Sequence, residues 1–586
     1  MEKRLILAVA VSIVILTVYN SLFLTTNKPA INNINSQNDT AAFSTLSAPV
    51  KKEVAVGDIT LSGRDSFSNS KDSPEYSIPD TNLIPNPVEK SYTIKNNKIN
   101  IEFTNAGASI KNIYITGFNN LSTGKQLNLL NDTSCISRVN PLTVDIDQSG
   151  ELSEVVFNTV DYSETHIVFE YKTDAYYYGR GILRKSLLPP GLRLIKRFDL
   201  SPQDNTAKLS IKIIKPVDLN MPALNLIKVK KAETNDEYTG GISIDWTSGI
   251  ISENKVQNSF MHLPAGSLKK ELPETGNKQD DGLYGTETKN IFKKIISVSE
   301  SKWIGLSTNY FLIALTLEGV KSNIAVLYSD NLNIGFKYIS APLSFKDNAI
   351  DLNFNLFLGP KDYNLLEKQF PDLKMEESME YGWFNALALI LLKVLKFFYK
   401  IIPNYGVSII LLTILINVLL YPLKAKSFKA MEDMKVMQPK IEELKTKYAD
   451  DKVKIQQETM KLYKEHKINP IGGCLPMFLQ LPIFMGLYRM LQYAIELRGA
   501  PFLYISDLSA PDTIYVLPII MGITMFIQQK FTPAPPEQQK IFMFLPIIFT
   551  FMFRSMPAGL ILYWTAFNVI SIVQQLYQTK FSKRKR

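Results

Sequence analysis

Amide side chains stand near one end of four long apolar runs in the last third of this 586-residue chain. They are Asn417, Gln480, Gln528, Gln529, Gln574 and Gln575. An amide both donates and accepts hydrogen bonds, and it is costly inside a bilayer unless it meets a polar group. Amides at these positions therefore indicate either a binding surface or hydrogen bonds between helices, each worth about 0.6 kcal/mol.

Chemistry of other kinds has little support in the sequence. The two cysteines, Cys135 and Cys474, cannot form a zinc site or a disulfide framework. The three histidines have no cysteine or paired acid at ligand spacing. There is no phosphate-binding G-x-x-x-x-G-K-[ST] loop, no acidic relay inside the apolar runs and no nucleophile with a base. We therefore expect no enzyme activity, no cofactor and no metal.

The apolar runs are long enough to cross a membrane, since about 20 residues of helix span 30 Å of hydrocarbon. Five such runs are Tyr405 to Leu423, Leu475 to Tyr493, Thr513 to Gln529, Ile541 to Ser555 and Ala558 to Tyr577. A sixth lies within residues 1–24 and follows two basic residues. A cleaved signal peptide is the alternative, but the run is longer than is usual for one and lacks a clear cleavage site, which favours an uncleaved anchor. We therefore predict six transmembrane helices, five of which form a helical core at residues 403–578.

Positive charge predicts the orientation of these helices. The segment 424–467 holds twelve lysines and eight acids, and the tail 579–586 holds five basic residues and no acid. Basic segments beside apolar runs are retained in the cytoplasm. Both termini are therefore predicted to be cytoplasmic, with the amides in the cytoplasmic half of the bilayer and Asn568 near mid-depth. Arg554 lies close enough to the periplasmic end of its run to reach the interface.

Residues 381–402 have a different character. This segment is apolar, but Lys393, Lys396 and Lys400 are spaced by three and four residues, and Trp383 stands at its start. The lysines then share one face of an amphipathic helix that lies along the membrane surface. If this helix crossed the bilayer, the lysine-rich segment that follows would be exported, against the charge rule.

The segment 424–467 is expected to form a cytoplasmic helical hairpin. Its helices are predicted at Ser427 to Tyr448 and Asp451 to His466, with a turn between them. Apolar residues recur at helical spacing on both helices, so they could face one another. They are Met431, Met434, Ile441, Leu444 and Tyr448 on the first helix and Val453, Met460 and Tyr463 on the second.

The region between the first two spans is polar and is predicted to be periplasmic. Residues 25–90 are rich in Asn, Ser, Thr, Asp and Pro, which is typical of a flexible linker. Residues 91–370 contain short alternating runs that predict a large antiparallel β-sandwich. The runs include Ile99–Phe103, Ile110–Ile115, Val155–Phe157, Leu209–Ile214 and Leu352–Leu358. Such a domain could be a scaffold, a surface for other proteins or a sugar-binding or sugar-modifying module, and its scattered acids define no catalytic pair.

Short motifs in the helical core resemble those of one known family. They are Tyr421-Pro422-Leu423, Met437-Gln438-Pro439-Lys440, Asn469-Pro470-Ile471-Gly472-Gly473-Cys474-Leu475-Pro476, Gln480-Leu481-Pro482-Ile483-Phe484, Asp507-Leu508-Ser509-Ala510, Leu517-Pro518-Ile519-Ile520-Met521-Gly522, and Pro557-Ala558-Gly559-Leu560 with Tyr563-Trp564. In combination they resemble the bacterial YidC insertases, which are relatives of the mitochondrial Oxa and chloroplast Alb proteins. The resemblance covers residues 381–578, and the large exported domain resembles the Gram-negative form.

The resemblance implies an insertase and chaperone that acts alone or beside the Sec translocon on nascent inner-membrane proteins. It implies a groove lined by Thr413, Gln480 and Trp564, and a sandwich similar to sugar mutarotases without their activity. Together with the residues chosen by depth and motif, the predicted groove, hydrophilic and open to the cytoplasm, comprises Thr413, Asn417, Gln480, Gln528, Tyr563, Trp564 and Asn568. The predicted hairpin site comprises Met431, Met434, Met437, Pro439 and Lys440.

One position departs from the pattern of the family. The family usually has an arginine in the second span, where this chain has Asn417. Because asparagine carries no charge, we expect a neutral groove that attracts acidic segments of a client only weakly. On this interpretation, Asn417→Arg would improve the insertion of clients with acidic exported tails.

Other partners and other functions are also compatible with the sequence. The tail Lys583-Arg584-Lys585-Arg586 could bind anionic lipids or the RNA of a ribosome, and nothing indicates DNA. A transporter or channel for a small solute is the main alternative function. Transporters tend to have inverted repeats and a midplane site, and this sequence has no such symmetry. A membrane-anchored envelope enzyme that acts through the sandwich is a third possibility.

Overall fold

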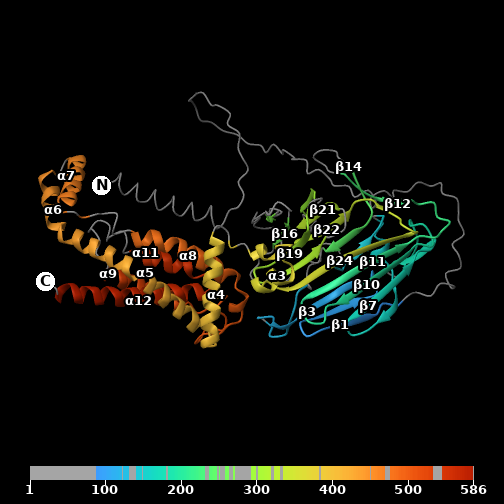
Figure 1. Cartoon of the computed structure of the whole chain (residues 1–586), viewed down its shortest axis with the longest axis horizontal. Coiled ribbons are helices and arrows are strands. Elements are labelled where there is room, and N and C mark those ends of the chain that lie inside the picture. The colour runs from blue at the N-terminus through green and yellow to red at the C-terminus, as the bar shows by residue number, and fades with distance from the viewer. Residues whose placement is uncertain are drawn as a thin grey trace, which may run out of the picture. The chain divides into compact units, whose positions relative to one another are not determined.

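The computed structural model of this chain describes residues 88–584 apart from several gaps (Figure 1). The gaps are residues 122, 131–139, 148, 180–181, 231–236, 247–249, 251–257, 263–267, 271–291, 298–300, 318–321, 330–333, 380, 382–383, 449–450, 467, 469–474 and 532–543. The predicted span in residues 1–24, nearly all of the predicted linker and Trp383 therefore lie outside the described residues.

Antiparallel strands build the region from Ser91 to Pro360, and the largest sheet has nine of them (Figure 1). In spatial order they are β17 (Leu268–Lys270), β16 (Asn258–His262), β19 (Trp303–Ser307), β20 (Phe311–Thr316), β24 (Ala349–Pro360), β11 (Thr206–Ile214), β10 (Arg193–Leu200), β7 (His166–Lys172) and β6 (Asn158–Tyr162). Four neighbouring pairs in this order are consecutive in sequence, namely β16–β17, β19–β20, β10–β11 and β6–β7, whereas β16–β19, β20–β24, β24–β11 and β10–β7 join more distant segments.

Two further sheets and three short ribbons complete this region. The five-stranded sheet contains β18 (Phe292–Ser297), β21 (Ser322–Ser329), β22 (Ile334–Ser340), β15 (Ser243–Trp246) and β5 (Thr143–Asp145). The four-stranded sheet contains β1 (Ser91–Lys95), β2 (Ile99–Thr104), β3 (Ser109–Asn119) and β4 (Gln126–Asn128). The ribbons pair β12 (Ala223–Leu224) with β23 (Leu343–Ser344), β13 (Ile227–Lys230) with β14 (Glu237–Gly240), and β8 (Tyr176–Gly179) with β9 (Ile182–Lys185).

Alternation of apolar and polar residues explains why these segments form strands. On β11, Leu209, Ile211 and Ile213 are buried, whereas Lys208 and Lys212 are exposed. Successive side chains of a strand point to opposite faces, so this pattern places one apolar face toward the core. β11 pairs along its whole length with β10 on one side and β24 on the other.

The apolar faces of the three large sheets share one hydrophobic core. Phe103 of β2 lies against Phe198 of β10, with ring centroids 4.6 Å apart. Tyr338 of β22 lies against Phe354 of β24, with centroids 6.1 Å apart. The nine-stranded sheet therefore packs against both smaller sheets, which makes this part of the chain β-rich and layered.

Four of the five strands predicted from the sequence coincide with β2, β3, β11 and β24. The prediction for Val155–Phe157 is wrong. These residues connect a short helix, α2 (Glu151–Glu154), to β6, and Phe157 donates its backbone N–H to the carbonyl oxygen of Asn105. Their apolar side chains fill the core from a connection, which alternation alone cannot distinguish from a strand.

Helices build the region from Tyr363 onward (Figure 1). They are α3 (Tyr363–Gln369), α4 (Asn385–Ile401), α5 (Tyr405–Val436), α6 (Gln438–Lys447), α7 (Lys452–Glu465), α8 (Leu475–Tyr493), α9 (Val516–Phe531), α11 (Leu545–Phe553) and α12 (Ala558–Arg584), with 3₁₀ turns η2 (Met375–Met379) and η5 (Ile495–Leu497). α4, α5, α8, α9, α11 and α12 supply a second hydrophobic cluster, which is the core of the helical region.

Two helices in the described part of the chain are both long enough and apolar enough to cross a membrane. They are α5 and the part of α12 from Ala558 to Gln578. α9 is apolar but shorter, and α11 has nine described residues, which rise about 13 Å. The number of six spans stays a prediction.

The helix predicted to lie along the membrane surface is α4. Its buried face carries Ala388, Leu391, Leu392 and Leu395. Lys393 and Lys400 are exposed, as an amphipathic helix requires. Lys396 differs from them, because its ammonium group pairs with carboxylates on two other elements. The three lysines have the spacing of one helical face, as predicted, but Lys396 is half-buried because of these ion pairs.

The predicted hairpin is divided differently from the expectation. α5 continues past Leu423 to Val436, with Pro422 inside it, and the chain breaks at Met437. The prediction of one continuous helix over Ser427–Tyr448 is therefore wrong, because this stretch is divided between α5 and α6. Pro439 stands in the first turn of α6, where its missing N–H costs nothing, and it cannot continue α5.

The predicted contacts within the hairpin are also partly wrong. α6 has no buried residue, and Val453 and Met460 of α7 are exposed. Two short helices can bury little apolar surface against each other, so neither helix has a core face. The hairpin consequently presents apolar side chains outward.

Candidate functional site in the helical region

Asn417 lies fully buried on α5. Its Nδ2 donates to the carbonyl oxygen of Thr413, 2.8 Å away, and its Oδ1 accepts from Lys424 Nζ at 2.6 Å. Seven residues are about two helical turns, so Asn417 and Lys424 share one face of α5. Helical side chains point toward the helix N-terminus, which is why the lysine reaches back to the amide.

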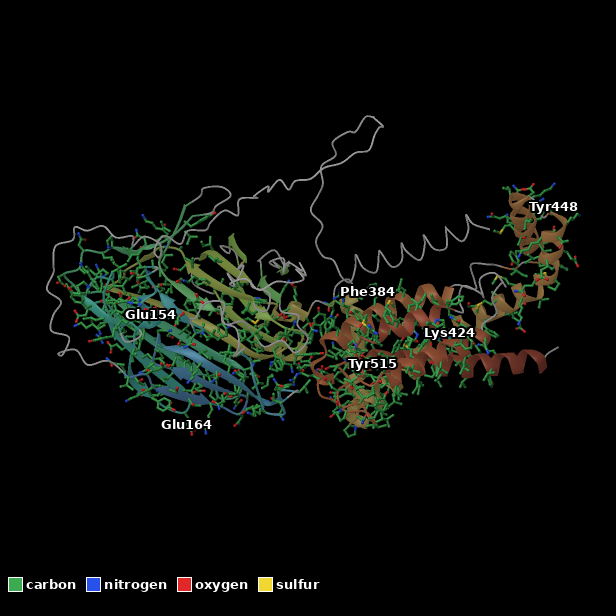
Figure 2. The ribbon with its side chains drawn as sticks, turned by 180° about the vertical axis from the view of Figure 1, so that it is seen from behind. Glu154, Glu164, Phe384, Lys424, Tyr448 and Tyr515 are labelled. Carbon is green, nitrogen blue, oxygen red and sulfur yellow. The ribbon has the colours of Figure 1, made fainter. Side chains whose placement is uncertain are left out.

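Lys424 brings a positive charge to this part of the bundle (Figure 2). Its Nζ lies 3.4 Å from Ser571 Oγ and 4.0 Å from the ring centroid of Phe567, both on α12. No carboxylate in the described part of the chain pairs with it. The expectation of a neutral groove is therefore wrong, because Lys424 supplies a cation beside Asn417.

Gln574 of α12 adds a second link between α12 and α5. Its Nε2 lies 3.5 Å from the carbonyl oxygen of Asn417. Its Oε1 is buried and accepts no hydrogen bond from any described residue. An amide oxygen in this state retains its full capacity to bind a donor.

Gln480 of α8 forms a separate link to α12. Its Nε2 donates to the hydroxyl oxygen of Tyr563 at 2.7 Å, and Tyr563 is fully buried. As with Gln574, the Oε1 of Gln480 is buried and finds no donor among the residues that the structure describes. The structure thus brings two of the predicted site residues into direct contact.

Asn568 connects α12 to α9. It is buried, and its Nδ2 lies 3.2 Å from Thr524 Oγ1. Gln528, one helical turn beyond Thr524, is half-buried. α12 therefore makes polar contacts with α5, α8 and α9 at three separate places, in which the predicted residues Asn417, Gln480, Tyr563 and Asn568 take part.

Thr413 takes part in the polar contacts only through its carbonyl oxygen, which accepts from Asn417, and Trp564 lies beside them. The hydroxyl of Thr413 donates to the carbonyl oxygen of Ile409 in its own helix, at 2.7 Å. Trp564 packs among phenylalanine rings, with centroid distances of 4.9 Å to Phe484 and 5.3 Å to Phe553. The hydroxyl of Thr413 is therefore already used within its own helix, and the ring of Trp564 forms part of an aromatic cluster.

The predicted hairpin residues lie on a different stretch of chain. Met431 and Met434 are half-buried near the end of α5, and Met437 stands at the break before α6. Pro439 and Lys440 are exposed in the first turn of α6. Nζ of Lys440 lies 3.2 Å from Nε2 of His466, which follows α7.

Reasoning from the sequence missed Lys424, Ser571 and Thr524. Lys424 was counted with the charges of the hairpin segment, because it follows the last apolar residue of the predicted span. Its spacing of seven residues from Asn417 was the available signal. Ser571 and Thr524 had no signal of comparable strength, since hydroxyl side chains are common in membrane helices.

Comparison with known proteins places these elements in a family. Residues 397–585 match the family model described as 60Kd inner membrane protein, and residues 273–394 match the model described as YidC periplasmic domain. A membrane protein insertase YidC from Syntrophus aciditrophicus is 47% identical over 284 residues, which are 47% of this chain and 52% of the relative. The chain belongs to the YidC family of membrane protein insertases. The predicted family is confirmed, and YidC insertases are not enzymes.

A second YidC relative, from Geotalea daltonii, is 47% identical over 329 residues, which are 53% of this chain and 61% of the relative. The chain thus matches between half and two thirds of the length of these curated relatives. The family models make it an inner membrane protein with a β-rich periplasmic domain and a helical membrane region, as predicted.

Two solved structures have similar chains. A YidC insertase with its first transmembrane domain resolved is 18% identical, covers 83% of this chain and 92% of its own, and has a TM-score of 0.35. A galactose mutarotase related enzyme from Lactobacillus acidophilus is 11% identical, covers 46% of this chain and 97% of its own, and has a TM-score of 0.30.

Proposed function

We propose that this chain inserts and folds inner-membrane proteins, and that a client's hydrophilic segment enters the bilayer at the polar contacts around α12. One observation carries the proposal. The ammonium group of Lys424 lies inside the helical region against Asn417 and Ser571, with no carboxylate of the described residues beside it. A cation in such a place is costly unless an anionic group reaches it.

Buried amide oxygens support the same function. Gln480 and Gln574 each keep an Oε1 that accepts no hydrogen bond from the described residues. Amides that served only to join helices would be expected to use both ends. We infer that these oxygens, with Lys424, form a hydrophilic groove open to the cytoplasm, lined by the seven residues predicted from the sequence.

The proposed mechanism depends on how deep Asn417 lies within the bilayer. Asn417 lies six residues inside the predicted end of its span, which is about 9 Å along the helix. A polar segment that binds there has that much less hydrocarbon left to cross. Its apolar neighbours can then move sideways into lipid. Catalysis of any covalent step is unnecessary, because the free energy comes from burying the client's apolar residues.

The topology proposed for this function has six spans, with both termini in the cytoplasm. The proposed domains are the anchor 1–24, linker 25–90, periplasmic sandwich 91–370, interfacial helix 381–402, core 403–578 with hairpin 424–467, and tail 579–586. The basic hairpin and tail support a cytoplasmic position for both.

The proposed clients are nascent inner-membrane proteins, taken up alone or together with the Sec translocon. The hairpin receives them through Met431, Met434 and Met437, because methionine side chains adapt to varied apolar segments. The basic tail binds anionic lipids, or ribosomal RNA when a client arrives during translation.

Reconstitution of the full chain in liposomes tests the proposal. The client is a short two-helix protein whose exported segment is either acidic or neutral, and insertion is read by protection from protease. Lys424→Gln should lower insertion of the acidic client by about tenfold, which corresponds to one hydrogen bond to a charged group. Lys429→Gln is the matched control, since Lys429 is exposed one turn further along α5.

Two outcomes would contradict the proposal. If Lys424→Gln leaves insertion of the acidic client unchanged, the lysine has no role in binding it. If it lowers insertion of both clients equally and also lowers the melting temperature, Lys424 acts only by holding α5 against α12.

A further inference from the structure

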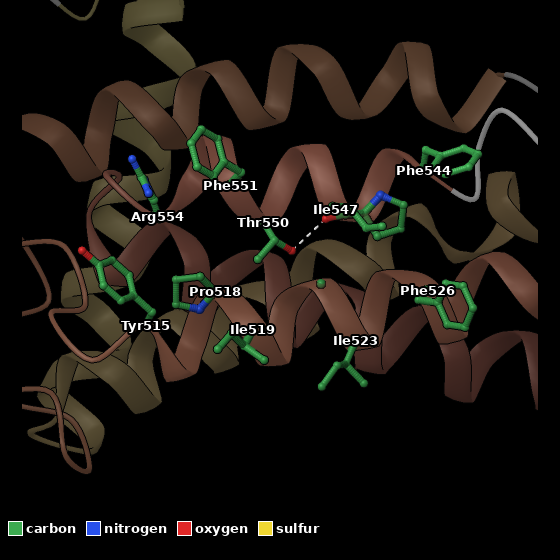
Figure 3. A pocket seen from close by; sticks show the side chains of 12 residues that line it. Tyr515, Pro518, Ile519, Ile523, Phe526, Phe544, Ile547, Thr550, Phe551 and Arg554 are labelled. Carbon is green, nitrogen blue, oxygen red and sulfur yellow. Dashed lines mark hydrogen bonds between the residues drawn. The ribbon is translucent and has the colours of Figure 1, made fainter.

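An open groove lies between α9 and α11, away from the polar contacts around α12 (Figure 3). It encloses about 720 Å³, and most of its wall is aliphatic or aromatic. The two helices approach closely at its floor, where a Cβ on Gly522 would lie 2.1 Å from Thr550 Oγ1. The hydroxyl of Thr550 donates to the carbonyl oxygen of Pro546 at 2.7 Å, so it offers no donor to the groove.

One end of this groove is polar. Arg554 and Tyr515 lie together there, while Phe526 and Phe544 lie at the other end (Figure 3). Arg554 is the sole charged residue among the described residues that line the groove. It is exposed, and its guanidinium lies 4.1 Å from the ring centroid of Phe551. No described carboxylate pairs with it.

Tyr515 is held at this end by an unusual backbone conformation. Its φ is 57°, a left-handed conformation that a bulky residue rarely adopts. Its side chain is 50% exposed, and the neighbouring Asp512 fixes the start of α9 by accepting from the N–H of Leu517 at 2.8 Å. Strain of this kind persists where the surrounding structure requires it, and it often marks a binding site.

We propose that this groove binds one phospholipid of the leaflet opposite the hairpin α6–α7, with an acyl chain along α9 and the phosphate at Arg554 and Tyr515. Guanidinium groups bind phosphate through two parallel hydrogen bonds, and tyrosine hydroxyls favour the membrane interface. The apolar walls then contact hydrocarbon. The site requires only that the helical region lies in a membrane, so it does not depend on the insertase function.

The length of the groove favours a lipid over a transmembrane helix. Tyr515 and Phe526 are eleven residues apart, which is about 16 Å along a helix. One leaflet contributes half of the 30 Å hydrocarbon core, or about 15 Å. A transmembrane helix would need roughly twice this length and a trough 10–12 Å wide. The single cationic end also matches a ligand with one anionic headgroup.

Native mass spectrometry of the full chain, extracted from bilayers of phosphatidylglycerol and phosphatidylcholine, tests this proposal. The wild-type chain should retain one phosphatidylglycerol. Arg554→Gln should lower the retained fraction by about tenfold, as expected for the loss of a charge-assisted contact. Lys400→Gln is the control, because it removes an exposed positive charge from α4, outside this groove.

Two further variants separate charge from shape and from folding. Arg554→Lys keeps the charge and should keep most of the lipid, which shows that position 554 tolerates substitution. Ile547→Trp adds bulk to the apolar wall without a change in charge, and it should lower retention of both lipids. Retention that is equal in wild type, Arg554→Gln and Ile547→Trp would overturn the proposal. So would a photocrosslinker at position 547 that captures a client helix and no lipid.

Discussion

At the scale of single residues, ionisable groups inside apolar surroundings define what this protein can do. In the membrane region, Lys424 brings an ammonium group to within 2.6 Å of Asn417 Oδ1. In the β-rich domain, Glu151 is fully buried, and its carboxylate accepts from Ser186 Oγ at 2.6 Å and lies 3.4 Å from the hydroxyl of Tyr171. The first group faces the helices proposed to receive clients, and the second lies in a folded core. A change in the charge of Lys424 would therefore affect the proposed binding of clients, whereas a change in the charge of Glu151 affects the stability of the β-rich domain.

A double variant tests whether Lys424 replaces the arginine that is usual in the family. Lys424→Gln should lower insertion of clients with acidic tails, and Asn417→Arg in the same chain should restore it, because both side chains carry a cation to one face of α5. The measurement is insertion into liposomes, relative to Asn417→Gln in the same background. In the wild-type chain, Asn417→Arg should add little, since Lys424 is already present. If Asn417→Arg raises insertion no more than Asn417→Gln does in this background, Lys424 does not replace the arginine of the family.

Glu151 makes the stability of the β-rich domain depend on pH. Burial raises the pKa of Glu151 from 4.5 to about 7. The folded state then binds the proton more tightly, so stability decreases as pH rises from 4.5 to 7 and is constant for this group outside that range. Burial also raises the pKa of Asp145 to about 6, which acts in the same direction.

Glu151→Gln should remove the part of this dependence that comes from Glu151, about 3 kcal/mol between pH 4.5 and 7. The free energy of unfolding is measured on the full chain in detergent, from the urea midpoint of the near-ultraviolet circular dichroism of the β-rich domain. Glu164→Gln is the control, because Glu164 is exposed. A variant whose stability falls with pH as steeply as the wild type would show that Glu151 is already ionised in the folded state.

At the scale of elements, apolar periodicity predicted the long helices of the membrane region and the strands β2, β3, β11 and β24, while local breaks escaped it. The bounds of α8 coincide with the predicted run because that run begins and ends sharply in the sequence. The division between α5 and α6 was missed, since Met431, Met434 and Ile441 continue one helical period across Met437. The helix nevertheless ends at Val436, because the ring of Pro439 cannot be accommodated inside a continuing helix. The open groove beside Gly522 was missed as well, because it depends on which two helices meet.

Pro439→Ala should join α5 and α6 into one helix, because alanine restores the N–H that proline lacks and removes the clash with the preceding turn. Spin labels at Lys429 and Glu443, both exposed, should then lie about 21 Å apart with a narrow distribution, as in a continuous helix. The wild-type distance should be shorter. Pro422→Ala is the control, since α5 already continues through Pro422. An unchanged distance in Pro439→Ala would mean that the break at Met437 has another cause.

At the scale of the whole molecule, contacts between distant segments were beyond the sequence. Strands such as β11 could be predicted from their own alternation, whereas β19 and β20 are buried on both faces and do not alternate. β24 pairs with β11 across more than a hundred residues, and no local pattern encodes that choice. The ion pairs of Lys396 could not be predicted from a local pattern either. Its carboxylate neighbours, Asp362 and Glu496, lie before α3 and in η5, far from α4 in sequence.

Lys396 joins three elements of the chain. Its Nζ lies 3.0 Å from an oxygen of Asp362, the residue that caps α3, and it also pairs with Glu496 in the loop after α8. Two residues further along that loop, Arg498 donates from Nη2 to the carbonyl oxygen of Asn119 at 2.7 Å. The loop after α8 thus contacts both α4 and β3, and the ammonium group offsets two carboxylates that would otherwise repel each other.

Lys396→Gln should loosen this loop, because Asp362 and Glu496 would lose their common cation. The pairs are partly exposed, so we expect a loss of about 1–2 kcal/mol in local stability rather than the full Coulomb energy. Hydrogen exchange of the amides in residues 494–502 should accelerate by about tenfold in the full chain, and high salt should have a similar but smaller effect. Lys393→Gln, an exposed lysine on the same helix, is the control. Equal exchange in both variants would mean that other hydrogen bonds, such as that from the Arg498 guanidinium to the carbonyl oxygen of Asn119, hold the loop without help from Lys396.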